Sequence, residues 1–177
     1  MIVRRELPAD QAAVRAVIAA AFTRDGTDPI EARLLDELRA DSGWLPQFSL
    51  VAVDGDETAG GEIVGHVVCT RGRVVGEAGE TPALGLGPIG VRPDRQGQGI
   101  GLALMHAVLG AADALDEPLV ALLGSPAFYG RFGFRRSTDF EITPPEPDWA
   151  EYFQIRPLTA YAPTPGVFRY AAPFEGL

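Results

Sequence analysis

The sequence contains no lysine: all 15 of its basic residues are arginine. This absence excludes a Walker-type phosphate loop and a protein-kinase site, because both place a lysine ammonium on nucleotide phosphates. It also excludes covalent catalysis through a lysine Schiff base. Histidine and cysteine are nearly as scarce, with 2 histidines and 1 cysteine. A zinc site built from His and Cys is therefore close to excluded, since such a site needs three or four of these ligands.

Long hydrophobic runs and paired cysteines are also missing. No apolar run approaches the roughly 20 residues that a membrane-spanning helix needs. The first residues, MIVRRELPADQ, lack the apolar core and the small-residue cleavage site of a signal peptide. Cys69 stands alone, so no intrachain disulfide can form. We therefore expect a cytoplasmic protein without a membrane partner.

Length and charge bound the fold and the partners. At 177 residues, with 46% hydrophobic and 22% charged residues, the chain is expected to be a single domain over residues 1–177. The net charge of −9 argues against non-specific binding to nucleic acid. Residues 91–140 carry equal numbers of arginines and acids and are the only part of the chain that is not acidic. One local site for a phosphorylated ligand is compatible with this distribution.

Hydrophobic periodicity and turn residues predict the element order β-αα-βββ-α-β-α-ββ. The expected strands are residues 1–7, 49–53, 63–75, 81–91, 118–123, 152–158 and 166–170, and the expected helices are residues 8–22, 29–42, 98–114 and 126–132. Asp28 and Ser125 are expected to cap two of these helices, each followed by a proline at the first helical position. Gly65 and Gly72 are expected to mark bulges or close approaches. This order predicts an α+β (α/β layered) fold with a mixed central sheet.

The stretch VRPDRQGQGIGLALM, residues 91–105, places three glycines at alternate positions directly before a helix-forming run. A dinucleotide-binding fingerprint fails on spacing, because Leu102 occupies the position of its third glycine. A flexible loop remains an alternative. We favour a loop that wraps its backbone N–H groups around a phosphate at the helix N-terminus, where these donors have no intrahelical partner.

The strand before this loop is also unusual, because residues 81–91 contain three glycines and Pro88. Proline cannot donate to a β-ladder, so this strand must be open to one side or broken near Pro88. A strand splayed from its neighbour can bind an extended, amide-bearing ligand in the gap. A ligand with an amide-bearing arm and a pyrophosphate corresponds to coenzyme A.

Two motifs resemble those of the GNAT N-acetyltransferases. Residues 91–101 read V-x-P-x-x-Q-x-x-G-x-G, which is similar to the acyl-CoA signature of this superfamily, and residues 128–134, FYGRFGF, resemble its Y-x-x-x-G-F element. The pieces LGPIGV, LLGSPAFYGRFGF and GVFRYAAPF are similar more narrowly to the YhbS-like predicted acetyltransferases. The resemblance extends over about the whole chain in element order, and it implies the GNAT fold, with the sheet splayed between two strands.

The resemblance implies acetyl-CoA as a co-substrate, no metal, and a role for each motif residue. The strand backbone at residues 89–91 would hold the pantetheine arm, and residues 96–101 would hold the pyrophosphate. Tyr129 would be the general acid that protonates the leaving thiolate, since a phenol with a pKa near ~10 is protonated at neutral pH; the alternative for Tyr129 is a purely packing role. The implied cofactor-binding residues are Ile89, Gly90, Val91, Gln96, Gly97, Gln98, Gly99, Ile100, Gly101 and Ser125.

The sequence also departs from the family pattern. Many members carry an asparagine before the last helix, where this chain has LLGS, so Ser125 is the candidate for that place. Many use a glutamate on the splayed strand as general base, and residues 83–87 offer none. The base is therefore unassigned, and the candidates are Glu62, His66, Asp28, Glu31 and a chain of water molecules.

Three remaining polar residues are interpreted as structural. We expect His66 to be a buried residue with a polar partner on a mostly apolar strand. His106 lies inside the helix after the glycines and is expected to pack there or at a rim. Cys69 is expected to be a small core residue, because no supporting His and Asp pattern accompanies it.

The predicted function is an N-acetyltransferase that moves an acetyl group from acetyl-CoA to a primary amine by direct attack in a ternary complex. The acceptor is expected to be a small molecule or a peptide, because the chain outside residues 91–140 is acidic and discourages anionic acceptors. One alternative is a degenerate domain that binds acyl-CoA as a sensor without turnover, and another is a structural domain that binds none. A homodimer is compatible with all three.

Overall fold

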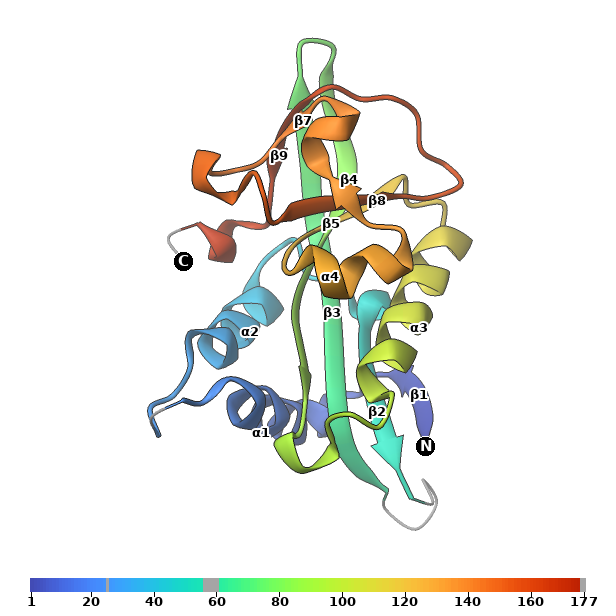
Figure 1. Ribbon diagram of the computed structural model, residues 1–177. Helices are drawn as coiled ribbons and strands as arrows, with labels where there is room; N and C mark the ends of the chain where they lie inside the picture. The colour runs from blue at the N-terminus through green and yellow to red at the C-terminus, as the bar shows by residue number, and fades with distance from the viewer. Residues whose placement is uncertain (25, 56–60, 176–177) are drawn as a thin grey trace.

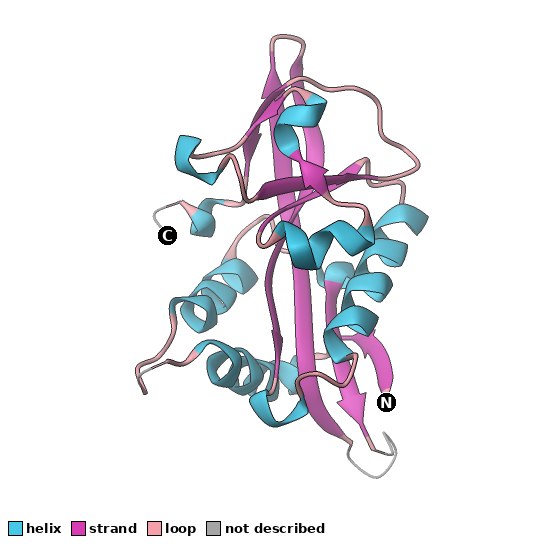
Figure 2. Cartoon of the chain, viewed as in Figure 1, coloured by secondary structure: helices cyan, strands magenta, loops and turns pink. Residues whose placement is uncertain are grey.

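The computed structural model describes residues 1–24, 26–55 and 61–175, in which helices cover both faces of a central mixed sheet (Figure 1; Figure 2). The strands are β1 (Ile2–Arg5), β2 (Ser49–Asp54), β3 (Glu62–Gly76), β4 (Gly79–Val91), β5 (Leu119–Leu123), β6 (Arg135–Arg136), β7 (Ile142–Thr143), β8 (Phe153–Pro157) and β9 (Gly166–Arg169). The helices are α1 (Gln11–Phe22), α2 (Ile30–Ala40), α3 (Ile100–Ala114) and α4 (Pro126–Tyr129). The predicted element order is confirmed. Strands β6 and β7 were not predicted, because two residues carry no periodicity.

The two faces of the sheet have separate cores. On one face α1 places Val14, Val17 and Ile18 against the strands β2 and β3. On the other face α3 places Leu104 and Val108 against the alternate residues of the same strands. In the described part of the chain no helix is long and apolar enough to cross a membrane.

The sheet opens where the pairing of the parallel strands β4 and β5 ends. Strands β1 to β4 are antiparallel to their neighbours, and β4 pairs with β5 in parallel after the crossover through α3. Only Leu84 and Gly85 of β4 have partners on β5, namely Val120 and Ala121. Strand β4 nevertheless continues to Val91. The predicted splay between two strands is confirmed, and it begins just before Pro88.

A bulge in β4 changes which face its side chains take. Val67 of β3 lies opposite Ile89 and Cys69 lies opposite Leu86, so two residues of β4 stand against one residue of β3. Strand β3 also has a bulge against β2, because Ala52 lies opposite Gly65 and Val53 opposite Ile63, which leaves Val64 as the extra residue beside Gly65. Gly65 and Gly72 each allow a close approach as well. A Cβ at Gly65 would lie 2.9 Å from Cγ2 of Ile100. A Cβ at Gly72 would lie 2.7 Å from Cζ of Phe168.

Neither predicted cap forms as expected. Pro29, and not Asp28, is the N-cap of α2, because its backbone is extended at ψ 153° and the helix begins at Ile30. The Asp28 carboxylate instead accepts a hydrogen bond from Arg15 at 2.7 Å. Ser125 does precede α4, but its side chain makes no capping hydrogen bond within the described residues.

Candidate active site

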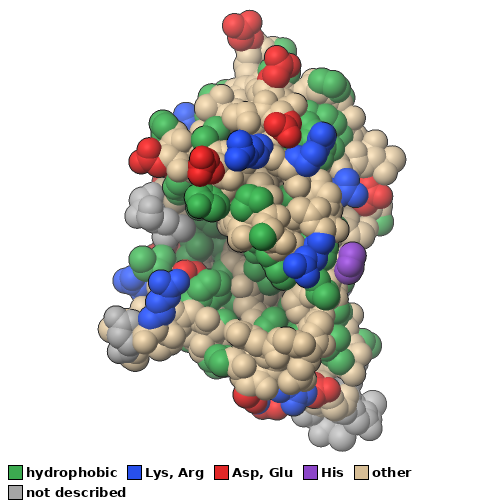
Figure 3. Space-filling view, viewed as in Figure 1, with side chains coloured by type: hydrophobic (Ala, Val, Ile, Leu, Met, Phe, Trp, Pro, Cys, Tyr) green, Lys and Arg blue, Asp and Glu red, His purple; other side chains and the backbone are tan. Residues whose placement is uncertain are grey.

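The opening of the sheet leads into a cleft of about 490 Å³ between the end of β4, the start of α3 and helix α4. Figure 3 shows this face of the molecule hollowed below α4. The cleft brings together nine of the residues predicted for the site: Ile89, Gly90, Val91, Gln96, Gly97, Gly99, Ile100, Gly101 and Tyr129. Gln98 and Ser125 were predicted with them and do not line the cleft as the structure describes it.

The glycine loop owes its shape to two left-handed residues. Gly97 has φ +74° and Gly99 has φ +83°, a conformation that side chains make costly. A Cβ built at either position meets no described atom within 4 Å, so the space in front of both is open. Gly101 lies in the first turn of α3, where a Cβ would be 3.9 Å from Cγ2 of Val91. Two of the three glycines are therefore required by the turn, and all three leave the backbone accessible.

The start of α3 presents free backbone donors to this open space. The first hydrogen bond of the helix runs from the N–H of Ala103 to the carbonyl of Gly99 at 3.0 Å. The N–H groups of residues 100–102 have no acceptor among the residues that the structure describes. All three residues line the cleft. Free N–H groups and the positive end of the helix dipole together favour an anion, and a phosphate in particular.

Side chains hold the loop in place. The Gln96 amide donates to the carbonyl of Val91 at 3.1 Å and ties the loop to the end of β4. The Gln98 amide lies 3.5 Å from the carbonyl of Asp94, which explains its absence from the cleft. Arg92 binds the Asp94 carboxylate through two hydrogen bonds of 2.8 and 2.6 Å. The loop is therefore preorganised by its own side chains.

The end of β4 exposes one of its two edges. Ile89 and Val91 pair with β3 on one side. On the other side, beyond Gly85, no described strand pairs with β4. The carbonyl of Val91 is taken by Gln96, which leaves the remaining edge groups at residues 89–91 for a ligand. An extended molecule with amide groups can bind such an edge as an added strand would.

Tyr129 is held by aromatic packing at the end of α4. Its ring centroid lies 4.9 Å from that of Phe128 and 5.9 Å from that of Phe134. Gly124 lies against the Tyr129 ring, which a Cβ at this position would overlap. Burial raises the pKa of the Tyr129 phenol above its usual value. Its hydroxyl has no hydrogen-bond partner within residues 1–24, 26–55 and 61–175. Tyr129 is therefore a protonated donor on the wall of the cleft.

None of the four predicted base residues lines the cleft in the described structure. Glu62 pairs with Arg92. Asp28 pairs with Arg15, and Glu31 lies in the first turn of α2. His66 is fully buried, and its Nε2 lies 2.9 Å from the Ser49 hydroxyl.

Burial lowers the pKa of His66 and favours the neutral imidazole. The histidine also lies 3.4 Å from the Glu6 carboxylate, so it belongs to a buried polar cluster. The structural interpretation of His66 thus fits its surroundings. Cys69 is likewise fully buried, and His106 is exposed with its ring 5.2 Å from that of Phe132.

Sequence reasoning missed Phe128 and two arginines on the cleft. Arg95 and Arg131 both line it, and the guanidinium of Arg131 lies 5.0 Å from the centre of the Phe128 ring. Arg131 lies inside the FYGRFGF motif, where it occupies one of the three unspecified positions between Tyr129 and Gly133. Its charge in an uncharged segment was the signal that could have identified it.

The comparisons with known proteins agree with this geometry. A model of the acetyltransferase (GNAT) domain matches residues 3–137. The uncharacterized N-acetyltransferase YhbS of Escherichia coli (strain K12) is 30% identical over 158 residues, which are 89% of this chain and 87% of that protein. The uncharacterized N-acetyltransferase YjhQ of the same strain is 32% identical over 104 residues, which are 59% of this chain and 55% of that protein.

Two solved structures are similar over nearly the whole chain. Escherichia coli YhbS in complex with CoA superposes with a TM-score of 0.84 at 30% identity, covering 98% of this chain and 91% of that one. A GNAT family acetyltransferase from Brucella melitensis in complex with acetyl-CoA gives a TM-score of 0.77 at 31% identity, covering 98% and 97%. The family expected from the two motifs is confirmed. This chain belongs to the GNAT family of N-acetyltransferases.

Proposed function

We propose that the protein transfers the acetyl group of acetyl-CoA to a primary amine of a small molecule or peptide, by direct attack in a ternary complex. One observation carries the proposal: free N–H groups at the start of α3 and a free edge of β4 face the same cleft. A pyrophosphate fits the first feature and an amide-bearing arm fits the second. Solved relatives with CoA and acetyl-CoA support this assignment of the cofactor.

Each cleft residue then has a task. The N–H groups of residues 100–102 bind phosphate oxygens, and Arg131, which follows α4, supplies a positive charge to the same cleft. The edge of β4 at residues 89–91 aligns the pantetheine arm with the opening of the sheet. Gly97 and Gly99 leave room for the phosphates to approach the backbone.

Acetyl-CoA supplies a thioester, whose carbonyl carbon forms the new C–N bond as the C–S bond breaks and the thiolate takes up a proton. Tyr129 is placed to give that proton, because its pKa is raised and its hydroxyl has no partner among the described residues. The proton lost by the amine passes to water, and water returns one to the phenolate. No protein side chain is needed as a base for these proton transfers if the amine binds in its neutral form.

A second candidate function has one observation in its favour. The described lining of the cleft contains no carboxylate and no histidine, so no side chain there accepts a proton at neutral pH. A domain that binds acyl-CoA as a sensor without turnover would share this feature.

Two measurements on one preparation separate these functions. Calorimetry reports the binding of acetyl-CoA, and a thiol-release assay over a panel of primary amines reports turnover. Binding together with amine-dependent thiol release supports the transferase. Binding without thiol release for any amine supports the sensor, and absence of binding contradicts both.

A further inference from the structure

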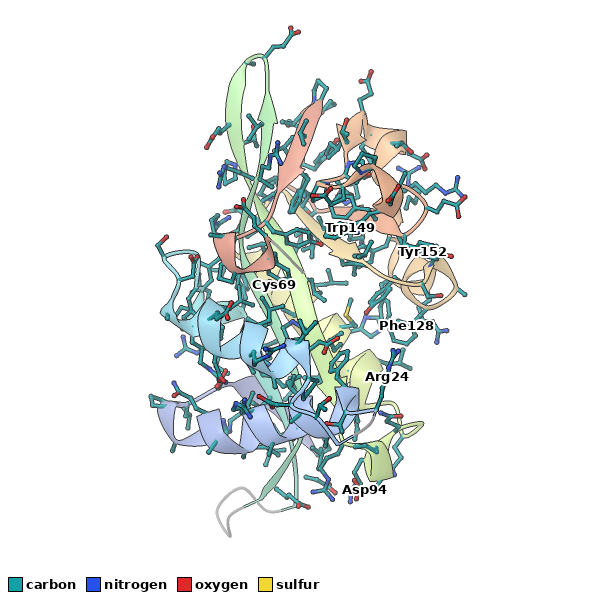
Figure 4. All side chains as sticks on the ribbon, turned by 90° about the vertical axis from the view of Figure 1, so that its left-hand side faces the viewer. Arg24, Cys69, Asp94, Phe128, Trp149 and Tyr152 are labelled. Atoms are coloured by element: carbon teal, nitrogen blue, oxygen red, sulfur yellow. The ribbon has the colours of Figure 1, made fainter. Side chains whose placement is uncertain are left out.

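A second cavity, of about 540 Å³, lies outside the cleft between the 3₁₀-helices η7 (Pro147–Trp149) and η8 (Ala172–Phe174). We call it the acidic pocket. Its lining is aromatic and acidic, and it includes Trp149, Tyr170, Phe174, Glu146, Asp148 and Glu175. Figure 4 views this side of the molecule and shows Trp149 above α2, on the side that carries the C-terminal segment.

The acidic pocket touches β4 at the point where the sheet opens. The Tyr170 ring covers Gly85, whose Cβ would overlap it, and Gly85 with Ala121 forms the last β4–β5 pair. A Cβ at Gly87 would lie 3.7 Å from the Phe174 ring. Tyr170 packs with Ala83 and Ala121, whereas Leu84 belongs to the core under α3. The pocket and the cleft therefore approach the same gap in the sheet from opposite faces.

Tyr170 points a polar group into this region without a protein partner. The side chain is only 7% exposed, and its hydroxyl forms no hydrogen bond with any residue that the structure describes. Its ring is fixed by Phe174, stacked at 4.4 Å, and by Phe168 at 4.9 Å. Burial raises the pKa of Tyr170, and the nearby Cys69 and Tyr129 act in the same direction. The ring is buried but the hydroxyl oxygen is reached by solvent, so it is open to a hydrogen bond with a ligand in the pocket that Tyr170 lines.

The charge of the pocket selects the ligand. Glu146, Asp148 and Glu175 are exposed and form no ion pair within the described chain, and the only cation in the lining as described is Arg169. Unpaired carboxylates around a concave surface attract cations. Trp149 adds an indole face, the aromatic surface that cations prefer. An ammonium group satisfies both features.

We propose that the acidic pocket is the acceptor site and that it takes a primary amine bearing a second positive charge, such as a diamine. The inference rests on the proposed function and adds a substrate class to it. The distal ammonium lies between the carboxylates and Trp149, and the chain of the amine runs over Tyr170 and Phe174. The reacting amine, in its neutral form, donates an N–H hydrogen bond to the Tyr170 hydroxyl oxygen, which leaves its lone pair free to attack the thioester, and it reaches the thioester through the gap in the sheet.

The test compares three amines of equal length that differ only at the far end: 1,5-diaminopentane, pentylamine and 5-aminopentanoate. With acetyl-CoA and the wild-type protein, we expect kcat/KM for thiol release to be at least about tenfold higher for the diamine than for pentylamine, and lowest for the carboxylate. In the double variant Glu146→Gln/Asp148→Asn the preference for the diamine falls at least about fivefold. Glu77→Gln, at the tip of the β3–β4 hairpin, is the matched control and retains the preference (Figure 1).

A binding measurement keeps this inference separate from the proposed function. Calorimetry with the same amines, in the presence of CoA, needs no turnover. If acetyl-CoA binds but no amine releases thiol, the proposed function fails, and diamine binding that is lost in the double variant still supports a cation site. Equal binding of diamine and pentylamine, or an unchanged preference in the double variant, overturns the inference. Tryptophan fluorescence of the Trp44→Phe variant, in which Trp149 is the single reporter, confirms the place of binding if the diamine changes the emission and contradicts it if the emission is constant.

Discussion

Gly101 offers the cleanest perturbation of the phosphate site. It lies in the first turn of α3 with an ordinary helical backbone, so a side chain there introduces no strain from a left-handed φ. Gly99 is less suitable, because its φ of +83° would add strain to any substitution. We therefore predict the effect of Gly101→Val.

The expected magnitude follows from the contacts at the helix start. A Cβ at Gly101 would lie 3.9 Å from Cγ2 of Val91, which is an ordinary contact. Because Gly101 lines the cleft, we expect the two methyl groups of valine to crowd the space that the N–H groups of residues 100–102 face. Losing one hydrogen bond to a charged phosphate is worth about 1.5–3 kcal/mol. This corresponds to a loss of roughly ten- to a hundredfold in affinity for acetyl-CoA. The unfolding free energy should change by less than about 0.5 kcal/mol, because valine and glycine differ little in helix propensity.

The same helix provides the control. Gly110 also lies in α3, a Cβ there meets no described atom within 4 Å, and Gly110 lies outside the cleft. Calorimetry with acetyl-CoA should find Gly110→Val unchanged and Gly101→Val weakened, while thermal unfolding reports that both are folded. Wild-type affinity in Gly101→Val, or an equal loss in both variants, would refute the phosphate site.

Three further predictions follow from the site and its surroundings. Tyr129→Phe keeps the ring packing and should slow acetyl transfer about 10²-fold in single-turnover measurements, with acetyl-CoA affinity nearly unchanged. Burial lowers the pKa of His66 below its value in the unfolded chain, so the free energy of unfolding should fall as the pH drops from 7 through about 6.5. In denaturant unfolding, His66→Gln should flatten this pH dependence, whereas His106→Gln should not. Arg131→Ala should weaken CoA binding severalfold at low salt, whereas Arg135→Ala, whose guanidinium lies over Phe140 outside the cleft, should not.

Each of these has a result that would contradict it. Wild-type turnover in Tyr129→Phe would leave the tyrosine as a packing residue and make water the acid. An unchanged pH dependence in His66→Gln would show that another group causes the loss of stability. Equal CoA affinity in Arg131→Ala and the wild type, at low and high salt, would remove the arginine from phosphate binding.

The features that the sequence predicted well are those that depend on local backbone chemistry. Pro88 has no N–H to donate, and the sheet does open beside it. Gly97 and Gly99 precede a helix, and both adopt the left-handed conformation that only glycine tolerates easily. Such requirements are readable from a few adjacent residues, so the cleft could be located before the structure was known.

The features that could not be predicted from the sequence depend on contacts between segments that are distant in the sequence, or on which face of its strand a residue occupies. The acidic pocket joins residues 145–149 to residues 169–175, and the path of the chain between them cannot be read from either segment. His66 and Glu62 were weighed as bases from their nearness in sequence to the glycine-rich strand. The structure places His66 inside a polar cluster with Ser49, and Glu62 beside Arg92. Ser125 lies four residues before Tyr129, but its side chain neither caps α4 nor lines the cleft among the described residues.

The central claim is that this cleft uses acetyl-CoA to acetylate an amine, and mass spectrometry of the reaction products tests it most directly. The protein is incubated with acetyl-CoA and 1,5-diaminopentane, beside a matched sample of Tyr129→Phe and one without protein. The account predicts a product heavier than the diamine by one acetyl group, formed with an equal amount of free CoA, and formed much more slowly by the variant. Free CoA without acetylated amine, or equal product in all three samples, would contradict it.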